Sequence, residues 1–84
     1  MPNVTLPAGT VVELYAATGI IPGTQLVVSG ISDAIVRLSA TETGLTSGND
    51  YETVTGNQTA FNAPGDLEAW ALCISGGGVN VKES

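Results

Sequence analysis

The sequence has no histidine and a single cysteine, Cys73. One cysteine forms no intrachain disulfide, and a transition-metal site without histidine would need an unusual shell made of carboxylates alone. We therefore expect no disulfide, no metal and no cofactor. A small domain without such staples depends on core packing or on association with other chains. This favours a homo-oligomer or a protein docked on a larger body.

Basic residues are nearly absent, since Arg37 and Lys82 face eight acidic residues for a formal net charge of −6. Proteins that bind nucleic acids or anionic membranes present clusters of Lys and Arg. The composition therefore excludes nucleic acid and membrane surfaces as partners. We expect Arg37 to pair with a nearby carboxylate such as Asp33 or Glu42, as exposed charges commonly do.

Charged residues of either sign are also scarce, at 12% of the chain, about half the share in ordinary globular domains. The surface must then consist largely of Thr, Ser, Asn, Gln and Gly, which suits an extracellular or virion module better than a cytosolic enzyme. No apolar run has the length of a transmembrane helix or of a signal-peptide core, so we expect neither.

The length of 84 residues sets the domain count. A second core would leave each half below the size at which chains commonly fold without staples. We expect residues 1–84 to form a single domain. Pro2 and Pro7 exclude helix from residues 1–9, which are expected to be an extended arm, an edge strand or a frayed terminus.

The clearest pattern is an alternation with a period of two in residues 68–82, EAWALCISGGGVNVK. Bulky apolar residues alternate with small ones before three glycines, and valines alternate with polar residues after them. The pattern predicts a β-hairpin with one apolar face. We place this hairpin at the centre of the core because Trp70, the only tryptophan, has the largest apolar side chain to bury.

Short strands alternate with turn signals along the rest of the chain. Pro22-Gly23 predicts a type II turn, Gly56-Asn57 predicts a tight hairpin turn, and the polar residues 40–50 predict a loop. No segment has the apolar spacing of an amphipathic helix. The fold class is therefore all-β, a small antiparallel β-sandwich or barrel of about six to eight short strands. The intervals predicted as strands are 10–16, 24–29, 34–39, 51–55 and 59–62.

The inward positions of these strands define a predicted core. It consists of Leu14, Leu26, Val28, Val36, Leu38, Trp70, Leu72, Ile74, Val79 and Val81.

The other face of the Trp70 strand carries only small side chains, which let another sheet or subunit approach closely. The strand at 10–16 is apolar on both faces, so either it is central in a two-layer structure or its second face meets a partner. Together these features favour self-association, as a trimer about an axis. The residues predicted at a subunit or partner interface are Val11, Tyr15, Ala69, Ala71 and Cys73.

The sequence argues against an enzyme. Cys73 has no histidine or lysine nearby to activate it and is expected to pack as a small hydrophobe. The acidic residues Asp50, Glu52, Asp66 and Glu68 lack both a calcium-loop pattern and material for a cleft, so we interpret them as solubilising charges that guard strand edges. The three glycines at 76–78 are not a phosphate loop, because no GK[ST] motif follows.

Five short strings of the chain carry a resemblance to a known family. They are LYAATGI at 14–20, PGTQL at 22–26, VRLS at 36–39, WAL at 70–72 and GGGVNV at 76–81. Together they resemble small virion proteins of tailed bacteriophages, namely decoration, fibre-base or tail-accessory components. The resemblance implies a β-rich structural module, often trimeric, with no catalytic residues. Such proteins commonly have a longer variable loop between the Arg37 strand and the Trp70 strand, and its shortness here favours a cementing role over receptor binding.

The resemblance leads to the expectation of a capsid decoration or cementing protein, located on the virion after assembly in the host cytoplasm. It would bind capsid or tail subunits as a homo-oligomer, through strand edges and apolar patches. The alternative is a receptor- or carbohydrate-binding β module of a phage fibre or tail. In that alternative Trp70, Tyr15 or Tyr51 would form the stacking platform.

Overall fold

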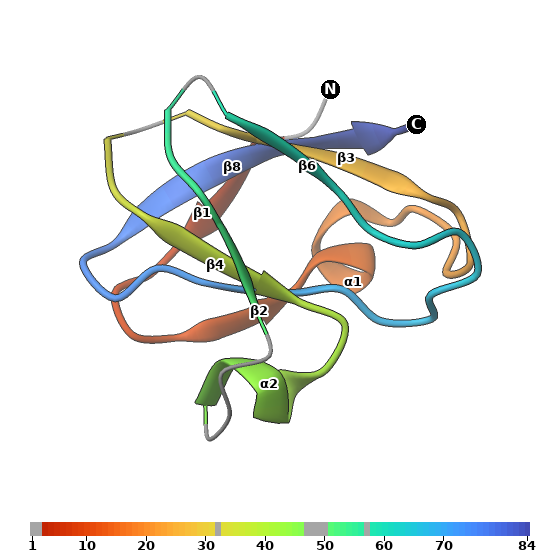
Figure 1. The fold of residues 1–84 in the computed structure, drawn as a ribbon, viewed down its shortest axis with the longest axis horizontal. Coiled ribbons are helices and arrows are strands. Elements are labelled where there is room, and N and C mark those ends of the chain that lie inside the picture. Colours follow the sequence, from red (N-terminus) through yellow and green to blue (C-terminus); the bar gives the residue numbers. More distant parts are fainter. Residues whose placement is uncertain (1–2, 32, 47–50, 57) are drawn as a thin grey trace.

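A computed structural model describes residues 3–31, 33–46, 51–56 and 58–84. These residues form eight strands and two short helices (Figure 1). In chain order the elements are β1 (Asn3–Leu6), β2 (Val11–Glu13), α1 (Leu14–Thr18), β3 (Leu26–Gly30), β4 (Val36–Ser39), α2 (Glu42–Thr46), β5 (Glu52–Val54), β6 (Thr59–Phe61), β7 (Trp70–Leu72) and β8 (Gly77–Glu83).

The strands form two four-stranded sheets, which we name sheet A (order β1-β8-β3-β6) and sheet B (order β2-β7-β4-β5). Every pair of neighbouring strands within them is antiparallel. The sheets cross each other in the view of Figure 1, and one core cluster draws buried residues from both. The predicted all-β sandwich is confirmed.

The core between the sheets is built from aliphatic side chains. Val79 and Val81 of β8 and Val36 of β4 are fully enclosed, and burying each such side chain contributes about 1.5–3 kcal/mol. Leu38 is only half-buried and packs against the cluster. The predicted core residues that are buried are Leu14, Leu26, Val28, Val36, Leu72, Val79 and Val81.

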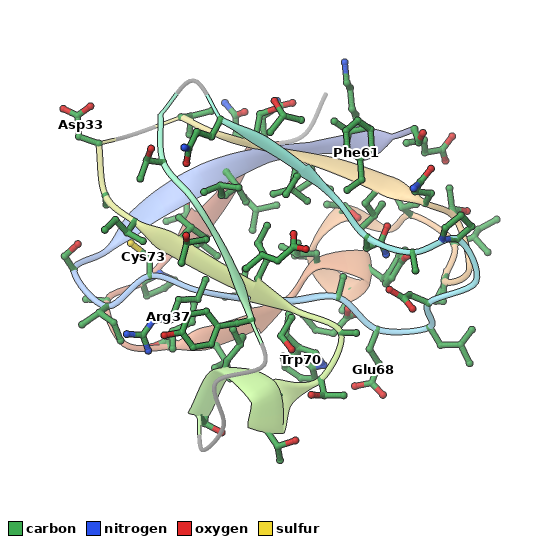
Figure 2. All side chains as sticks on the ribbon, in the orientation of Figure 1. Asp33, Arg37, Phe61, Glu68, Trp70 and Cys73 are labelled. Carbon is green, nitrogen blue, oxygen red and sulfur yellow. The ribbon has the colours of Figure 1, made fainter. Side chains whose placement is uncertain are left out.

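The assignment of Ile74 and Trp70 to the core is wrong. Ile74 lies in the turn after β7 and is 58% exposed. Trp70 is half-buried, and its Nε1 donates a hydrogen bond to Glu68 Oε1 at 2.7 Å, at the molecular surface (Figure 2). The indole therefore does not fill the centre of the sandwich.

The predicted hairpin at 68–82 is also wrong, since β7 belongs to sheet B and β8 to sheet A. The chain crosses between the sheets in a tight turn, in which Gly76 N donates to Cys73 O at 3.2 Å and Gly76 has a φ of 86°. Alternation with a period of two specifies that both segments are strands. It does not specify that they pair with each other.

The predicted strand 10–16 ends early because Glu13 starts a helix. Its Oε1 accepts from Ala16 N at 2.8 Å and its Oε2 from Tyr15 N at 3.2 Å, which satisfies two backbone donors at the start of α1. Gly19, with a φ of 78°, ends the helix. The cap outweighs the β propensity of this short segment.

The segment predicted as a loop at 40–50 contains α2, and its residues 47–50 lie outside the described residues. Gly44 N donates to Thr41 Oγ1 at 3.1 Å in the first turn. The helix packs on β4 and β7, and its Leu45 is buried. Leu72, on the outer face of β7, is also buried.

The segments 51–55 and 59–62 are strands as predicted, but they do not form a hairpin, because β5 belongs to sheet B and β6 to sheet A. Gly56 instead forms an isolated parallel bridge with Gly30, while Asn57 lies outside the described residues.

Two other local predictions agree with the structure. In the Pro22-Gly23 turn, Thr24 N donates to Ile21 O at 3.2 Å and Gly23 has a φ of 97°, as a type II turn requires. Residues 3–6 are the edge strand β1, which pairs with β8. Because Val4 and Leu6 are buried in this way, that segment packs on its own chain rather than reaching out as an arm.

Candidate functional site

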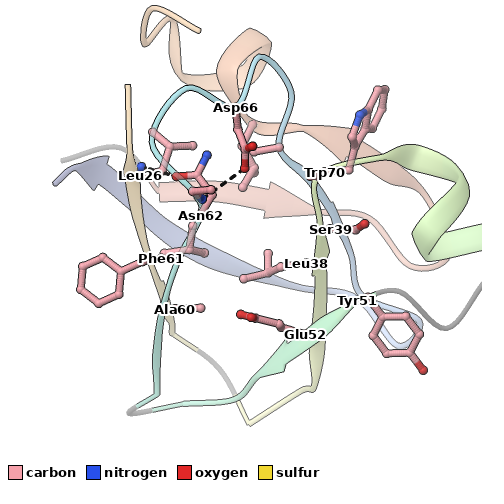
Figure 3. A pocket seen from close by; sticks show the side chains of 15 residues that line it. Leu26, Leu38, Ser39, Tyr51, Glu52, Ala60, Phe61, Asn62, Asp66 and Trp70 are labelled. Atoms are coloured by element: carbon pink, nitrogen blue, oxygen red, sulfur yellow. Dashed lines mark hydrogen bonds between the residues drawn. The ribbon is translucent and has the colours of Figure 1, made fainter. Parts of the chain in front are cut away.

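The two sheets leave an opening between the edge strands β5 and β6. A pocket of about 300 Å³ lies there (Figure 3), and we call it the inter-sheet pocket. Its floor is apolar, consisting of Leu14, Leu26, Val28, Leu38 and Ala60. A volume near 300 Å³ is at the lower end of the range for small-ligand sites.

Glu52 lines this pocket from an exposed position on β5. Glu52 pairs with Leu38 in the β4–β5 register, and Val54, two residues further on, pairs with Val36. Since Val54 and Val36 face the core and strand side chains alternate, Glu52 is also on the inner face. Figure 3 shows its carboxylate directed between Leu38 and Ala60. A charge that points inward on an edge strand also discourages pairing with another sheet.

Asn62 fixes the end of the pocket next to β3. Its Oδ1 accepts from Leu26 N at 2.6 Å, and its Nδ2 donates to the hydroxyl of Tyr15 at 2.8 Å. The same hydroxyl donates to Thr24 O at 2.6 Å. The sequence analysis did not single out Asn62; the only available signal was an Asn between a strand and a Pro-Gly turn.

Two more charged residues, Asp66 in the pocket lining and Arg37 next to the lining residue Tyr51, already have partners within the chain. Asp66 Oδ2 accepts from Ala63 N at 3.2 Å. Arg37 lies over the ring of Tyr51, with its Cζ 4.8 Å from the ring centroid. The rings of Tyr51, Phe61 and Trp70 point away from the pocket (Figure 3), so they do not form a common stacking surface inside it.

The expected partner of Arg37 is therefore wrong. Asp33 and Glu42 are both among the described residues, and neither forms an ion pair with it. Asp33 lies in the β3–β4 connection, well separated from Arg37 in Figure 2. The guanidinium stacks on an aromatic ring instead, a contact worth about 0.5–1 kcal/mol at exposed sites.

The predicted interface is mostly interior. Ala69, Ala71 and Cys73 are buried within the chain's own core, so their small side chains admit the second sheet rather than another subunit. Tyr15 is 3% exposed and belongs to the Asn62 network. Only Val11 is half-exposed. The pattern of small residues predicted a close approach correctly, but it contained no information on which surface approaches.

Exposed apolar side chains gather at one end of the sandwich. Ile31 is 50% exposed, and Ile35 and Ile74 are each 58% exposed. They lie on the β3–β4 and β7–β8 connections, which are both on the left side of Figure 1. We call these three residues the isoleucine end. This end was not predicted from the sequence, because Ile35 was assigned to a strand and Ile74 to the core.

The opposite end, near α1, also exposes apolar side chains. Ile21 and Leu67 are both largely exposed. Their turns are joined by hydrogen bonds from Gly23 N to Asp66 O at 2.8 Å and from Gly65 N to Gly23 O at 3.0 Å. This end is therefore held in one arrangement by its backbone.

Within the described part of the chain, no group of three or more Cys, Asp or Glu side chains is placed to hold a metal ion. No helix among the same residues is long and apolar enough to cross a membrane. Comparison of the chain with protein-family models, with curated proteins and with solved structures gave no significant match. The class that the structure defines is an all-β sandwich with an open pocket between its sheets.

Proposed function

We propose that this chain is a structural protein of a tailed-phage virion, a capsid decoration or cementing protein that binds capsid or tail subunits as a homo-oligomer, with a trimer as the favoured state. The observation that carries the proposal is the isoleucine end. The isoleucine end is an apolar surface on which another protein could dock. It supports the proposal independently of the resemblance between the chain's sequence strings and small virion proteins.

The three apolar side chains of the isoleucine end lie at one end of the molecule instead of being scattered over its surface. Single exposed apolar residues are normal on protein surfaces, whereas grouped ones are typical of contact sites. Ile35 and Ile74 follow the alternation of β4 and β7 to one edge of the sandwich, and Ile31 approaches Gly78 of β8 from the neighbouring connection. Covering them with another chain would gain about 25 cal/mol for each Å² of apolar surface removed from water.

The sheet edges supply a second kind of contact. Strands β1 and β6 are the edges of sheet A, and β2 and β5 are the edges of sheet B. Unpaired main-chain groups on such edges accept a strand from another protein. The edges β1, β2 and β6 are favoured for this contact, because the inward-pointing charge of Glu52 discourages pairing at β5. A virion protein that combines an apolar end with free strand edges binds through shape and backbone pairing, without catalytic chemistry.

The experiment is reconstitution on particles. Virions stripped of accessory proteins are incubated with the purified chain and sedimented, and particle density is then compared with and without it. We expect co-sedimentation that saturates at a fixed number of copies, and new density at symmetry-related sites. Failure to co-sediment, or binding without saturation, would contradict the proposal.

A receptor- or carbohydrate-binding module is the second candidate, because Trp70 is half-buried rather than enclosed, and its ring, like that of Tyr51, is directed outward from the pocket. Tyr15 is no longer available for stacking, since it is buried. Titration with oligosaccharides, followed by tryptophan fluorescence, separates the candidates. A saturable change in emission favours the binding module, and an unchanged spectrum favours the structural role.

A further inference from the structure

The charges that line the inter-sheet pocket have one sign. Glu52 and Asp66 are its charged lining residues, and the whole chain has a net charge of −6. Of the two basic residues, Arg37 stacks on Tyr51 and Lys82 pairs with Val27 on the outer face of sheet A. Neither lines the pocket.

We propose that the inter-sheet pocket binds one lysine or arginine side chain from the surface of the protein on which this chain docks. The inference rests on the proposed function, since it names a contact through which the chain recognises its partner. Such a side chain has an apolar stem and a charged tip, and it places the two in different environments. The pocket provides both environments.

The apolar stem of a lysine or arginine side chain fits the apolar floor of the inter-sheet pocket. Leu38 of β4 and Ala60 of β6 line it from opposite sides, and Val28 of β3 is a further lining residue. These side chains belong to the main core or pack directly on it, so the floor is preformed. An alkyl stem placed there replaces water against apolar surface, at about 0.8 kcal/mol for each buried methylene.

The positively charged tip of such a side chain is complementary to the carboxylate of Glu52. Asp66 already accepts a hydrogen bond from Ala63 N, whereas no donor among the described residues reaches the Glu52 carboxylate. A neutral aliphatic side chain in the pocket would remove water from that carboxylate without replacing its hydrogen bonds, which is costly. An ammonium or guanidinium group replaces them and adds a charge-assisted bond.

The first test uses the isolated chain and small probes. Backbone amide signals are followed by NMR during titration with N-acetyl-lysine amide or N-acetyl-arginine amide, and with N-acetyl-norleucine amide as a neutral analogue. We expect saturable shifts at Leu38, Glu52 and Ala60 with at least one of the basic probes, and binding about fivefold weaker for the neutral one. Equal binding of the neutral analogue, or no saturable shift with either basic probe, would overturn the inference.

Glu52→Gln removes the charge while keeping the side-chain shape, and Glu42→Gln on α2 is the matched control outside the pocket. We expect Glu52→Gln to weaken binding of the basic probe about fivefold and Glu42→Gln to leave it unchanged. Both residues are exposed, so neither variant is expected to unfold. If both substitutions changed binding of the basic probe equally, the inference would be refuted.

The second test uses stripped particles and keeps the two proposals distinct. If Glu52→Gln dissociates from the particles at a lower salt concentration than the wild-type chain and Glu42→Gln do, the pocket is part of the docking contact. If all three bind equally, the inference fails and the virion function stands. If none binds but the basic probes still shift the pocket signals, the virion function fails, and the pocket stands as a site for basic side chains.

Discussion

Glu13 accepts a hydrogen bond from the backbone N–H of Ala69 at 2.9 Å, across 56 residues of sequence. The same carboxylate caps α1 through Tyr15 and Ala16. One side chain therefore joins the start of a helix to the segment that leads into β7. It holds α1 against sheet B at the end of the molecule opposite the isoleucine end.

We expect Glu13→Ala to lower the free energy of unfolding by about 2–3 kcal/mol, because it leaves three backbone donors without their acceptor. Glu13→Gln keeps one oxygen and is expected to cost less. Urea denaturation measures both effects. Glu83→Ala, an exposed acid near the end of β8, is the control and should change stability by less than about 0.5 kcal/mol.

Tyr15→Phe removes one hydroxyl from the network that includes Thr24 and Asn62. We expect a loss of about 1–2 kcal/mol, since the half-buried Thr24 carbonyl and Asn62 amide each lose a partner. Tyr51→Phe is the matched control, because no hydrogen bond joins the Tyr51 hydroxyl to the described residues. Equal stability of the two variants by thermal unfolding would show that the network contributes little.

Gly30, the last residue of β3, approaches the backbone just after β5 so closely that an added Cβ would overlap the carbonyl group of Thr55. We expect Gly30→Ala to destabilise the fold by about 3 kcal/mol or more. The new methyl group would overlap a backbone carbonyl, which cannot move aside without shifting the chain around it. At Gly9, a Cβ would meet open space, although φ is +69°, so Gly9→Ala is expected to cost only about 1 kcal/mol. Chemical denaturation of the two variants would contradict this account if their order were reversed.

The double variant Ile35→Asp, Ile74→Asp tests whether the isoleucine end mediates self-association. Both side chains are exposed, so the folded chain should retain its circular dichroism spectrum, while sedimentation velocity shifts from an oligomer, expected to be a trimer, to a monomer. Ile21→Asp at the other end is the control and should leave the oligomer intact. A wild-type chain that is already monomeric at working concentration would refute self-association altogether.

The sequence predicted strand positions well and their partners poorly. Leu26, Val28, Val79 and Val81 alternate as expected because alternation depends only on which face of a strand is buried. The pairing of β7 with β2 and β4, rather than with β8, depends on the long-range arrangement of two sheets. A local pattern of 15 residues contains no information on that arrangement.

Trp70 shows a second limit of sequence reasoning. Size predicted that the indole would occupy the centre, but its N–H needs an acceptor, which Glu68 provides at the surface. The inter-sheet pocket was missed for a related reason. Glu52 was interpreted as an edge charge, and only the β4–β5 register shows that it shares the inner face with Leu38.

The placement of β8 between β1 and β3 has a consequence for biosynthesis. As the ribosome extends the chain, β1 and β3 emerge long before the strand that joins them, so sheet A remains incomplete until residues 77–83 have left the exit tunnel. Non-local pairing of this kind is slow to form, on the order of milliseconds to seconds. Until β8 pairs with them, β1 and β3 of the nascent chain have unpaired edges and exposed apolar faces. Chaperones that bind such unpaired strands should therefore raise the yield of folded protein.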